Sequence, residues 1–119
     1  MNWIVAGALY CAAAVVAGAF GAHALAARLS AENLSLWETA ARYLMYGGLG
    51  LSLLGLAGRV LDQPLAVPGW SLLVGTLIFS GTVFGLALGS PRWFGAVTPI
   101  GGLLMIVGFV MFAVAAWRG

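Results

Sequence analysis

Apolar residues along the chain fall into four long blocks, separated by short stretches that contain charged residues or proline. Cutting at these stretches leaves segments 3–27, 40–60, 69–89 and 98–117. A helix rises about 1.5 Å per residue and the hydrocarbon core of a bilayer is about 30 Å thick, so each segment is long enough to cross. Strands are disfavoured because an open sheet leaves backbone groups unpaired in lipid. The pattern predicts an all-α integral membrane four-helix bundle, formed by residues 1–119 as a single domain.

The ends of these segments carry typical boundary residues. Tryptophans at positions 3, 37, 70, 93 and 117 lie near the proposed ends, as in the aromatic belts of membrane proteins. Thr98 and Pro99 fit an N-cap followed by proline at the first helical position. The alternative is that Pro99 kinks a helix that has already begun near Phe94.

The most polar stretch, residues 28–43, lies between the first two segments. Apolar residues at 34, 37, 41 and 44 follow helical spacing, and Glu38 and Arg42 form an i,i+4 pair in the favourable order. Ser35 and Glu38 also match a capping box. We expect a short amphipathic interfacial helix here, between the first and second membrane helices, that bends into the second span and keeps its charged face in water.

Composition supports the membrane interpretation. The chain has 119 residues, of which 63% are hydrophobic and 7% charged, whereas a soluble domain carries about a quarter charged residues. The net charge of +2 is too small for a nucleic-acid partner. One histidine and one cysteine, Cys11, are too few for a metal or haem site within one chain, so we expect no cofactor and no metal. No serine lies in a nucleophile motif and the acids are peripheral, so the sequence predicts no enzyme.

Small residues recur at helical spacing inside the segments. Helices in lipid associate through close packing of small side chains, because no hydrophobic force drives them together. Gly81, Gly85 and Gly89 recur every four residues and predict a packing ridge along the third span. The pattern indicates a compact bundle or a tightly packed oligomer. The predicted packing positions are Gly18, Gly21, Ala22, Gly81, Gly85, Gly89, Gly101 and Gly102.

His23 is the only histidine and follows the small-residue stretch "GAFGAH". It lies about 30 Å along a helix from Trp3, which places it at the far interface of the membrane. We interpret it as a hydrogen-bonded residue at a helix end, with a proton relay or ligand as the functional alternative. Positive charges do not orient the chain, because Arg59, Arg118 and the α-amine lie on one side and Arg28, Arg42 and Arg92 on the other. Four spans still put both termini on one side.

Four sequence blocks resemble a known family. They are "GAFGAHAL", "LSAENLSLWETAARY", "FSGTVFGLALG" and "VTPIGG", in this order. The chain resembles the YgdD-like and YwdK-like small multipass membrane proteins, catalogued as domain of unknown function 423, and is similar to transmembrane protein 256. The resemblance implies a four-span protein of the cell inner membrane and assigns no activity. Many members carry glutamine and histidine where this chain has Leu44 and Gly47.

Two functions fit these features. The first is a non-enzymatic scaffold, assembly or lipid-organising role through small-residue helix packing, with membrane lipids as partners and a homo-oligomer left open. The alternative is a small passive channel or transporter acting as an oligomer, lined by hydroxyl residues such as Ser80 and Thr82. No substrate can be assigned. The polar positions singled out are His23, Trp37, Glu38, Arg42, Tyr43, Ser80 and Thr98, and the start of the fourth span beside Arg92 is a weaker candidate for an anion.

Overall fold

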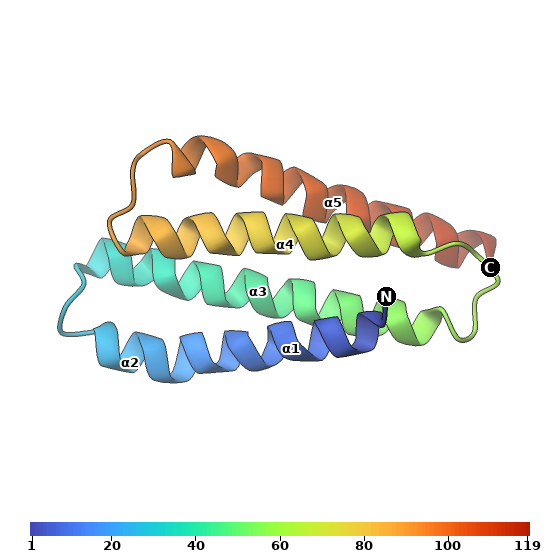
Figure 1. Cartoon of the computed structure of the whole chain (residues 1–119), viewed down its shortest axis with the longest axis horizontal. Coiled ribbons are helices and arrows are strands. Elements are labelled where there is room, and N and C mark those ends of the chain that lie inside the picture. Colours follow the sequence, from blue (N-terminus) through green and yellow to red (C-terminus); the bar gives the residue numbers. More distant parts are fainter.

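The computed structural model describes all residues, Met1–Gly119, as helices joined by short connections. The elements are α1 (Trp3–Val15), the π-helix η1 (Val16–Gly21), α2 (Ala22–Leu25), α3 (Ala31–Ala57), α4 (Ala66–Ala87) and α5 (Phe94–Arg118). Because α1, η1 and α2 follow one another without a break, the chain forms four rods that run side by side (Figure 1). Both termini lie toward the same end of the bundle (Figure 1). The all-α prediction is confirmed.

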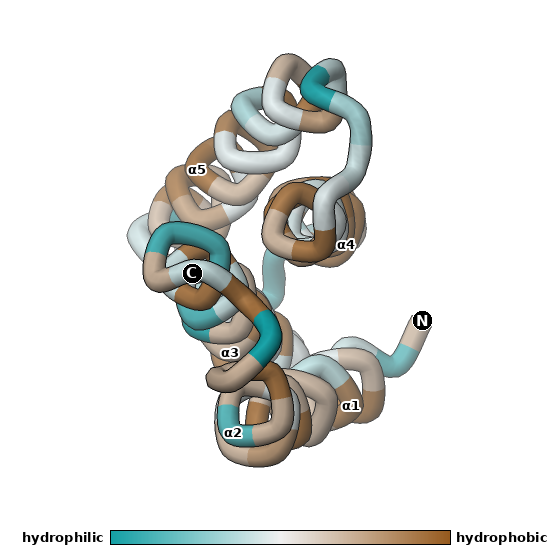
Figure 2. Tube along the Cα trace, turned by 90° about the vertical axis from the view of Figure 1, so that its left-hand side faces the viewer, coloured by the Kyte–Doolittle hydropathy of each residue, from teal (hydrophilic) through white to brown (hydrophobic).

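Three of the four rods are long and apolar enough to cross a membrane: Trp3–Leu25, Ala66–Ala87 and Phe94–Arg118. They coincide with the first, third and fourth predicted segments to within a few residues. The fourth rod, α3, has 27 residues and is more polar, since Glu32, Glu38 and Arg42 lie on it. Polar residues gather in the connections and at the helix ends, and the bodies of the helices are mostly apolar (Figure 2).

The polar stretch predicted as a separate interfacial helix is the first part of α3. Ser30 caps this helix, and its Oγ accepts a hydrogen bond of 3.1 Å from the Asn33 N–H. The predicted capping box at Ser35 was wrong, because Ser35 lies inside the helix. Residues 31–46 contain no glycine or proline that would break a helix, so α3 continues without interruption to Ala57. A separate interfacial helix is therefore not confirmed.

The prediction that Thr98 caps the last helix was wrong, because α5 begins at Phe94 and contains Pro99. The first N–H groups of α5, from Phe94 to Ala96, donate to the carbonyls of residues 91–93, so the turn after Pro91 starts the helix. Thr98 Oγ1 donates to the Phe94 carbonyl at 3.0 Å. Since Thr98 lies more than a turn inside α5, the free N–H groups expected there for an anion do not exist.

The two middle helices are α3 and α4. The first rod packs against α3 and α5 packs against α4, with α1 and α5 on opposite sides of the bundle (Figure 2). The fully buried side chains are Leu51 and Leu54 of α3 and Leu72, Thr76 and Ser80 of α4. The core of the bundle is thus the contact between α3 and α4, and the outer helices cover its two sides.

Glycines mark the closest helix contacts, but at other positions than the predicted ridge. A Cβ added at Gly75 would lie 2.7 Å from the Met105 nitrogen of α5, and one added at Gly101 would lie 2.8 Å from the Gly75 carbonyl oxygen. On the other side of the bundle, a Cβ at Gly48 of α3 would lie 2.8 Å from the Gly7 carbonyl oxygen of α1. Backbone therefore meets backbone at both outer contacts.

Within a single chain, Gly81, Gly85 and Gly89 do not form one continuous ridge against a neighbouring helix backbone. Gly81 is exposed, with nothing within 4 Å of an added Cβ. Gly85 faces the Phe94 ring rather than a helix backbone. Gly89 has a φ of 91°, and the Ser90 N–H bonds to the Gly85 carbonyl at 2.9 Å, so Gly89 ends α4 in a Schellman motif. The three glycines share a four-residue spacing, but only Gly85 and Gly89 occupy positions where the surroundings or the backbone favour glycine.

The remaining predicted packing positions divide in the same way. Gly101 makes a close contact with the α4 backbone, and Gly21 makes a close contact with a tryptophan ring. A Cβ at Gly18 would lie 3.8 Å from the Ala41 side chain, and one at Gly102 would lie 3.5 Å from the Phe79 ring, which are ordinary distances. Ala22 is half-buried at the start of α2.

Candidate functional site

The π-helix η1 contains most of the stretch "GAFGAH" and lies beside Trp37 of α3. The Ala22 N–H bonds to the Ala17 carbonyl, five residues back, as a π-turn requires. The same carbonyl accepts a hydrogen bond of 2.8 Å from the Trp37 indole Nε1. The Ala17 carbonyl oxygen thus connects the π-helical turn of the first rod to α3. Such π-helical turns occur frequently at functional sites.

The Trp37 ring also fixes two other elements. An added Cβ at Gly21 would lie 2.7 Å from the Trp37 ring, so only glycine allows this approach of η1 to α3. On the other side the ring meets Phe84 of α4 edge-on, with 4.5 Å between the ring centroids. Trp37 therefore holds the first rod, α3 and α4 together at the end of the bundle away from the termini.

Two hydroxyl residues of α4, Ser80 and Thr76, lie along the contact between α3 and α4. We call them the hydroxyl seam. The buried Ser80 Oγ donates to the Ala40 carbonyl of α3 at 2.9 Å. One turn away, Thr76 is completely buried against Gly47 of α3, and its Oγ1 has no hydrogen-bond partner. A buried hydroxyl without a partner costs about 1–3 kcal/mol. In this seam, the Ser80 hydroxyl has a hydrogen-bond partner and the Thr76 hydroxyl has none.

Hydroxyl groups join the other helices in the same manner. Thr82 of α4 and Thr98 of α5 share a hydrogen bond of 2.6 Å between their Oγ1 atoms. Ser71 Oγ donates to the Leu104 carbonyl of α5 at 2.6 Å, and the Tyr10 hydroxyl of α1 donates to the Leu73 carbonyl of α4 at 2.8 Å. In lipid, each such bond between helices contributes about 0.6–1.7 kcal/mol.

Tyr43 lies on the outer face of the seam, where α3, α4 and α5 enclose an apolar groove of about 350 Å³. Its ring packs on Phe79 with 4.5 Å between centroids and on Tyr46 with 5.2 Å. The Ile106 side chain of α5 forms the opposite wall and is 61% exposed. The groove is therefore lined by aromatic and aliphatic groups and opens sideways.

Glu38 and Arg42 lie one turn apart on another groove, of about 420 Å³, between the first rod and α3. Gly18, Ala14 and Ala41 form its floor. The Arg42 guanidinium donates to Thr39 Oγ1 at 3.3 Å. His23 is exposed at the end of the first rod, and the structure gives its side chain no hydrogen bond in support of our helix-end interpretation.

Trp37, Tyr43 and Ser80 lie at the α3–α4 contact, and Thr98 lies at the α4–α5 contact, whereas His23, Glu38 and Arg42 are exposed. Sequence reasoning missed the Ala17 carbonyl and the tight position Gly47. The first has no side-chain signal, because it depends on the π-turn. Gly47 did have a sequence signal, because it is adjacent to Gly48. Two adjacent residues of a helix point in different directions, so the pair indicates close contacts with two different helices.

Replacing Trp37 with phenylalanine is expected to lower the free energy of unfolding by about 1 kcal/mol. The phenyl ring keeps the contact with Phe84 and loses the bond to the Ala17 carbonyl, which still accepts the Ala22 N–H. Circular dichroism during unfolding in mixed micelles measures the change. The control is Trp93→Phe, because Trp93 is 62% exposed and we expect a change below about 0.5 kcal/mol. Equal losses in the two variants would contradict the role of the indole N–H.

Comparisons with known proteins agree with this membrane architecture. The family model described as "Protein of unknown function (DUF423)" matches residues 17–102, which include all but the first residue of the π-helix, Trp37 and the hydroxyl seam. The chain is 45% identical to a UPF0382 membrane protein of Staphylococcus saprophyticus over 98% of this chain and 97% of the relative. It is 44% identical to one of Staphylococcus epidermidis over 98% and 95%. No solved structure matches the chain. The chain therefore belongs to the DUF423 family of membrane proteins.

Proposed function

We propose that the chain crosses the membrane four times and acts without catalysis, as a scaffold that organises lipid in the grooves between its helices. The observation that carries this proposal is the division of polar and apolar groups. The Ser80, Thr82 and Thr98 hydroxyl groups join neighbouring helices, and the hollows lie on the outside, where two of them are almost entirely apolar. A rigid frame with apolar grooves suits acyl chains.

The fourth crossing is α3. Its 27 residues span about 40 Å, which exceeds the hydrocarbon core, and it lies between the first rod and α4. The longest dimension of the bundle is 49 Å, close to the thickness of a bilayer with its headgroups. With four crossings, both termini and the connection between α3 and α4 lie on one side of the cell inner membrane.

The alternative, a passive channel, needs hydroxyl groups that line a path. Ser71, Ser80 and Thr82 bond to neighbouring helices instead, and Thr76 is completely buried against Gly47. Within one copy, these side chains support helix contacts rather than a path. The channel alternative therefore requires a path between several copies of the chain, and a flux measurement tests for such a path.

Filling the groove beside Tyr43 is expected to reduce the phospholipid that copurifies with the chain. Ile106→Trp places a large ring between Tyr46 and Phe109, where an acyl chain would lie. The matched control is Ile100→Trp, because Ile100 is on the same helix, is 55% exposed and lines none of the grooves. Phosphate analysis and native mass spectrometry count the lipids per chain.

The scaffold proposal predicts fewer bound lipids in Ile106→Trp alone. It also predicts that liposomes containing the wild-type chain leak ions and small solutes no faster than liposomes without protein. Equal lipid content in all three proteins would contradict the lipid-organising role. Solute flux that is lost in Ser80→Ala or Thr98→Val would favour the channel.

A further inference from the structure

A groove between α4 and α5 has an arginine at one end and apolar side chains along the rest of its length. At the end of the bundle that holds the termini, a hollow of about 230 Å³ is lined by Arg118, Gln63, Pro68 and the last turns of α5. A second hollow, of about 450 Å³, lies farther along the same two helices and is lined by Trp70, Val74, Leu104 and Val107. Met111 lines both hollows, so they are adjacent, and together we call them the α4–α5 groove.

The α5 wall of the α4–α5 groove is a single stripe. Its members at 104, 107, 111, 114 and 118 are spaced by three and four residues, so they share one face of the helix. The stripe is about 21 Å long, longer than the roughly 15 Å of one leaflet's hydrocarbon. Val107 and Val114 are 41% and 42% exposed, and Trp70 on α4 is 48% exposed. The wall therefore offers an acyl chain a continuous apolar surface.

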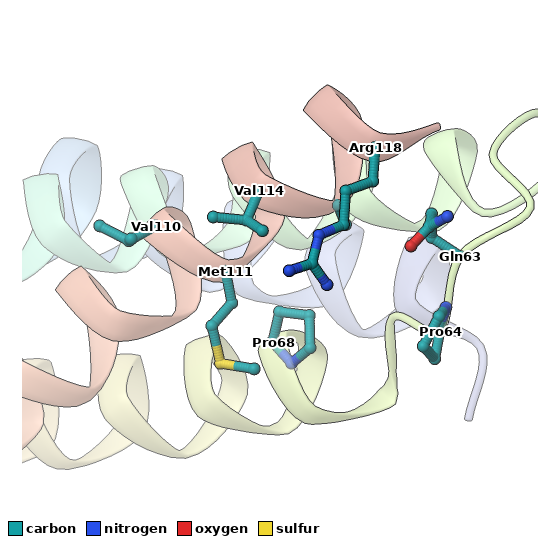
Figure 3. A pocket seen from close by; sticks show the side chains of 8 residues that line it. Gln63, Pro64, Pro68, Val110, Met111, Val114 and Arg118 are labelled. Atoms are coloured by element: carbon teal, nitrogen blue, oxygen red, sulfur yellow. The ribbon is translucent and has the colours of Figure 1, made fainter.

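The polar end of the α4–α5 groove carries a positive charge. Figure 3 shows the Arg118 side chain reaching from the last turn of α5 toward Pro68, with Gln63 across the opening. None of the eight residues that line this end is acidic. The groove beside Glu38 and Arg42 differs in this respect, because it holds one group of each sign. Arg118 is the only charged side chain among the residues that line this end, so the lining favours a headgroup with net negative charge over a zwitterionic one.

We propose that the α4–α5 groove binds one anionic glycerophospholipid, with its phosphate on Arg118, its headgroup beside Gln63 and an acyl chain along Met111, Val107 and Leu104. This proposal rests on the proposed function, because it assigns the lipid class and the position of one of the grooves. Trp70 lies at the depth where tryptophan commonly meets the boundary between headgroups and acyl chains.

The test is competitive lipid binding to the full chain in detergent, followed by native mass spectrometry. Phosphatidylglycerol and phosphatidylcholine with identical acyl chains are added in equal amounts. The wild-type chain is expected to prefer phosphatidylglycerol, and Arg118→Gln is expected to reduce that preference about fivefold, since one arginine near an anionic headgroup contributes about 1 kcal/mol. Arg118→Lys keeps the charge and is expected to retain most of the preference.

Two controls separate this site from general effects. Arg59→Gln removes a charge from the connection between α3 and α4, from a residue that does not line the groove, and is expected to leave the preference unchanged. Val107→Trp narrows the apolar part and is expected to weaken binding of both lipids, whereas Leu103→Trp, on the outer face of α5, is not. An unchanged preference in Arg118→Gln, or an equal loss in Arg59→Gln, overturns the assignment.

The outcome also separates this assignment from the scaffold proposal. Lipid retention that depends on Ile106 but shows no headgroup preference at Arg118 overturns the site and leaves the scaffold standing. A chain that retains no lipid at all overturns both.

Discussion

Gly101→Ala is expected to lower the free energy of unfolding by about 1–3 kcal/mol, which is the usual cost of forcing extra atoms into a packed contact. The added methyl group would meet the Gly75 carbonyl oxygen at 2.8 Å and the Phe79 Cα at 2.9 Å. Both neighbours are backbone atoms in the middle of α4, so neither can rotate away. The two helices must separate, and the hydrogen bond from Ser71 to the Leu104 carbonyl is stretched with them.

Gly81→Ala is the matched control, because Gly81 also lies inside a membrane helix and an added Cβ has nothing within 4 Å. Alanine favours helix over glycine by up to about 1 kcal/mol, so the control is expected to be as stable as the wild type or more stable. Unfolding in mixed micelles, followed by circular dichroism, compares the two variants. A loss in Gly81→Ala as large as in Gly101→Ala would mean that the exposed ridge is itself a contact, for example with a second copy.

The second large effect is expected at Gly47, in the centre of the α3–α4 contact. An added Cβ would lie 2.7 Å from the Thr76 Cβ and would also meet the Thr76 hydroxyl and methyl groups. We expect Gly47→Ala to lower the free energy of unfolding by about 1–3 kcal/mol. Because Thr76 is completely buried, its side chain has no open space into which it can turn.

Thr76→Ala is the variant that tests this explanation. Alone, it is expected to change the free energy of unfolding by less than about 1 kcal/mol, because losing methyl contacts offsets removing an unpartnered hydroxyl. In the Thr76→Ala background, Gly47→Ala is expected to cost at least about 1 kcal/mol less than in the wild type. Equal costs in the two backgrounds would show that Thr76 is not the obstacle.

The helices and most of their limits could be predicted from the sequence, because the length of an apolar block and the positions of Pro64, Pro68 and Pro91 are local signals. The positions of helix contacts could not. In a water-soluble protein, the contrast between apolar and polar faces shows which side of a helix is buried. A membrane helix is apolar on all sides, so the spacing of Gly81, Gly85 and Gly89 gave no indication that this face lies open.

Some side chains of the candidate site could be singled out from the sequence, but their hydrogen-bond partners could not. Trp37, Ser80 and Thr98 were singled out by residue type and by resemblance, and each makes a contact between helices. Their partners are the Ala17 and Ala40 carbonyls and a second threonine, Thr82. Backbone acceptors are identical at every position of a sequence, so which of them is used depends on the register between helices, and only the fold sets that register.

The order of contacts in the bundle has a consequence for biogenesis. Each outer contact joins neighbours in the chain, α1 with α3 and α4 with α5, and each of these pairs is closed by glycine backbones. With α3 as the proposed fourth crossing, the nascent chain can enter the bilayer as two successive hairpins. The two hairpins then associate through the α3–α4 contact, in which Ser80 donates a hydrogen bond to the Ala40 carbonyl and Thr76 is enclosed against Gly47.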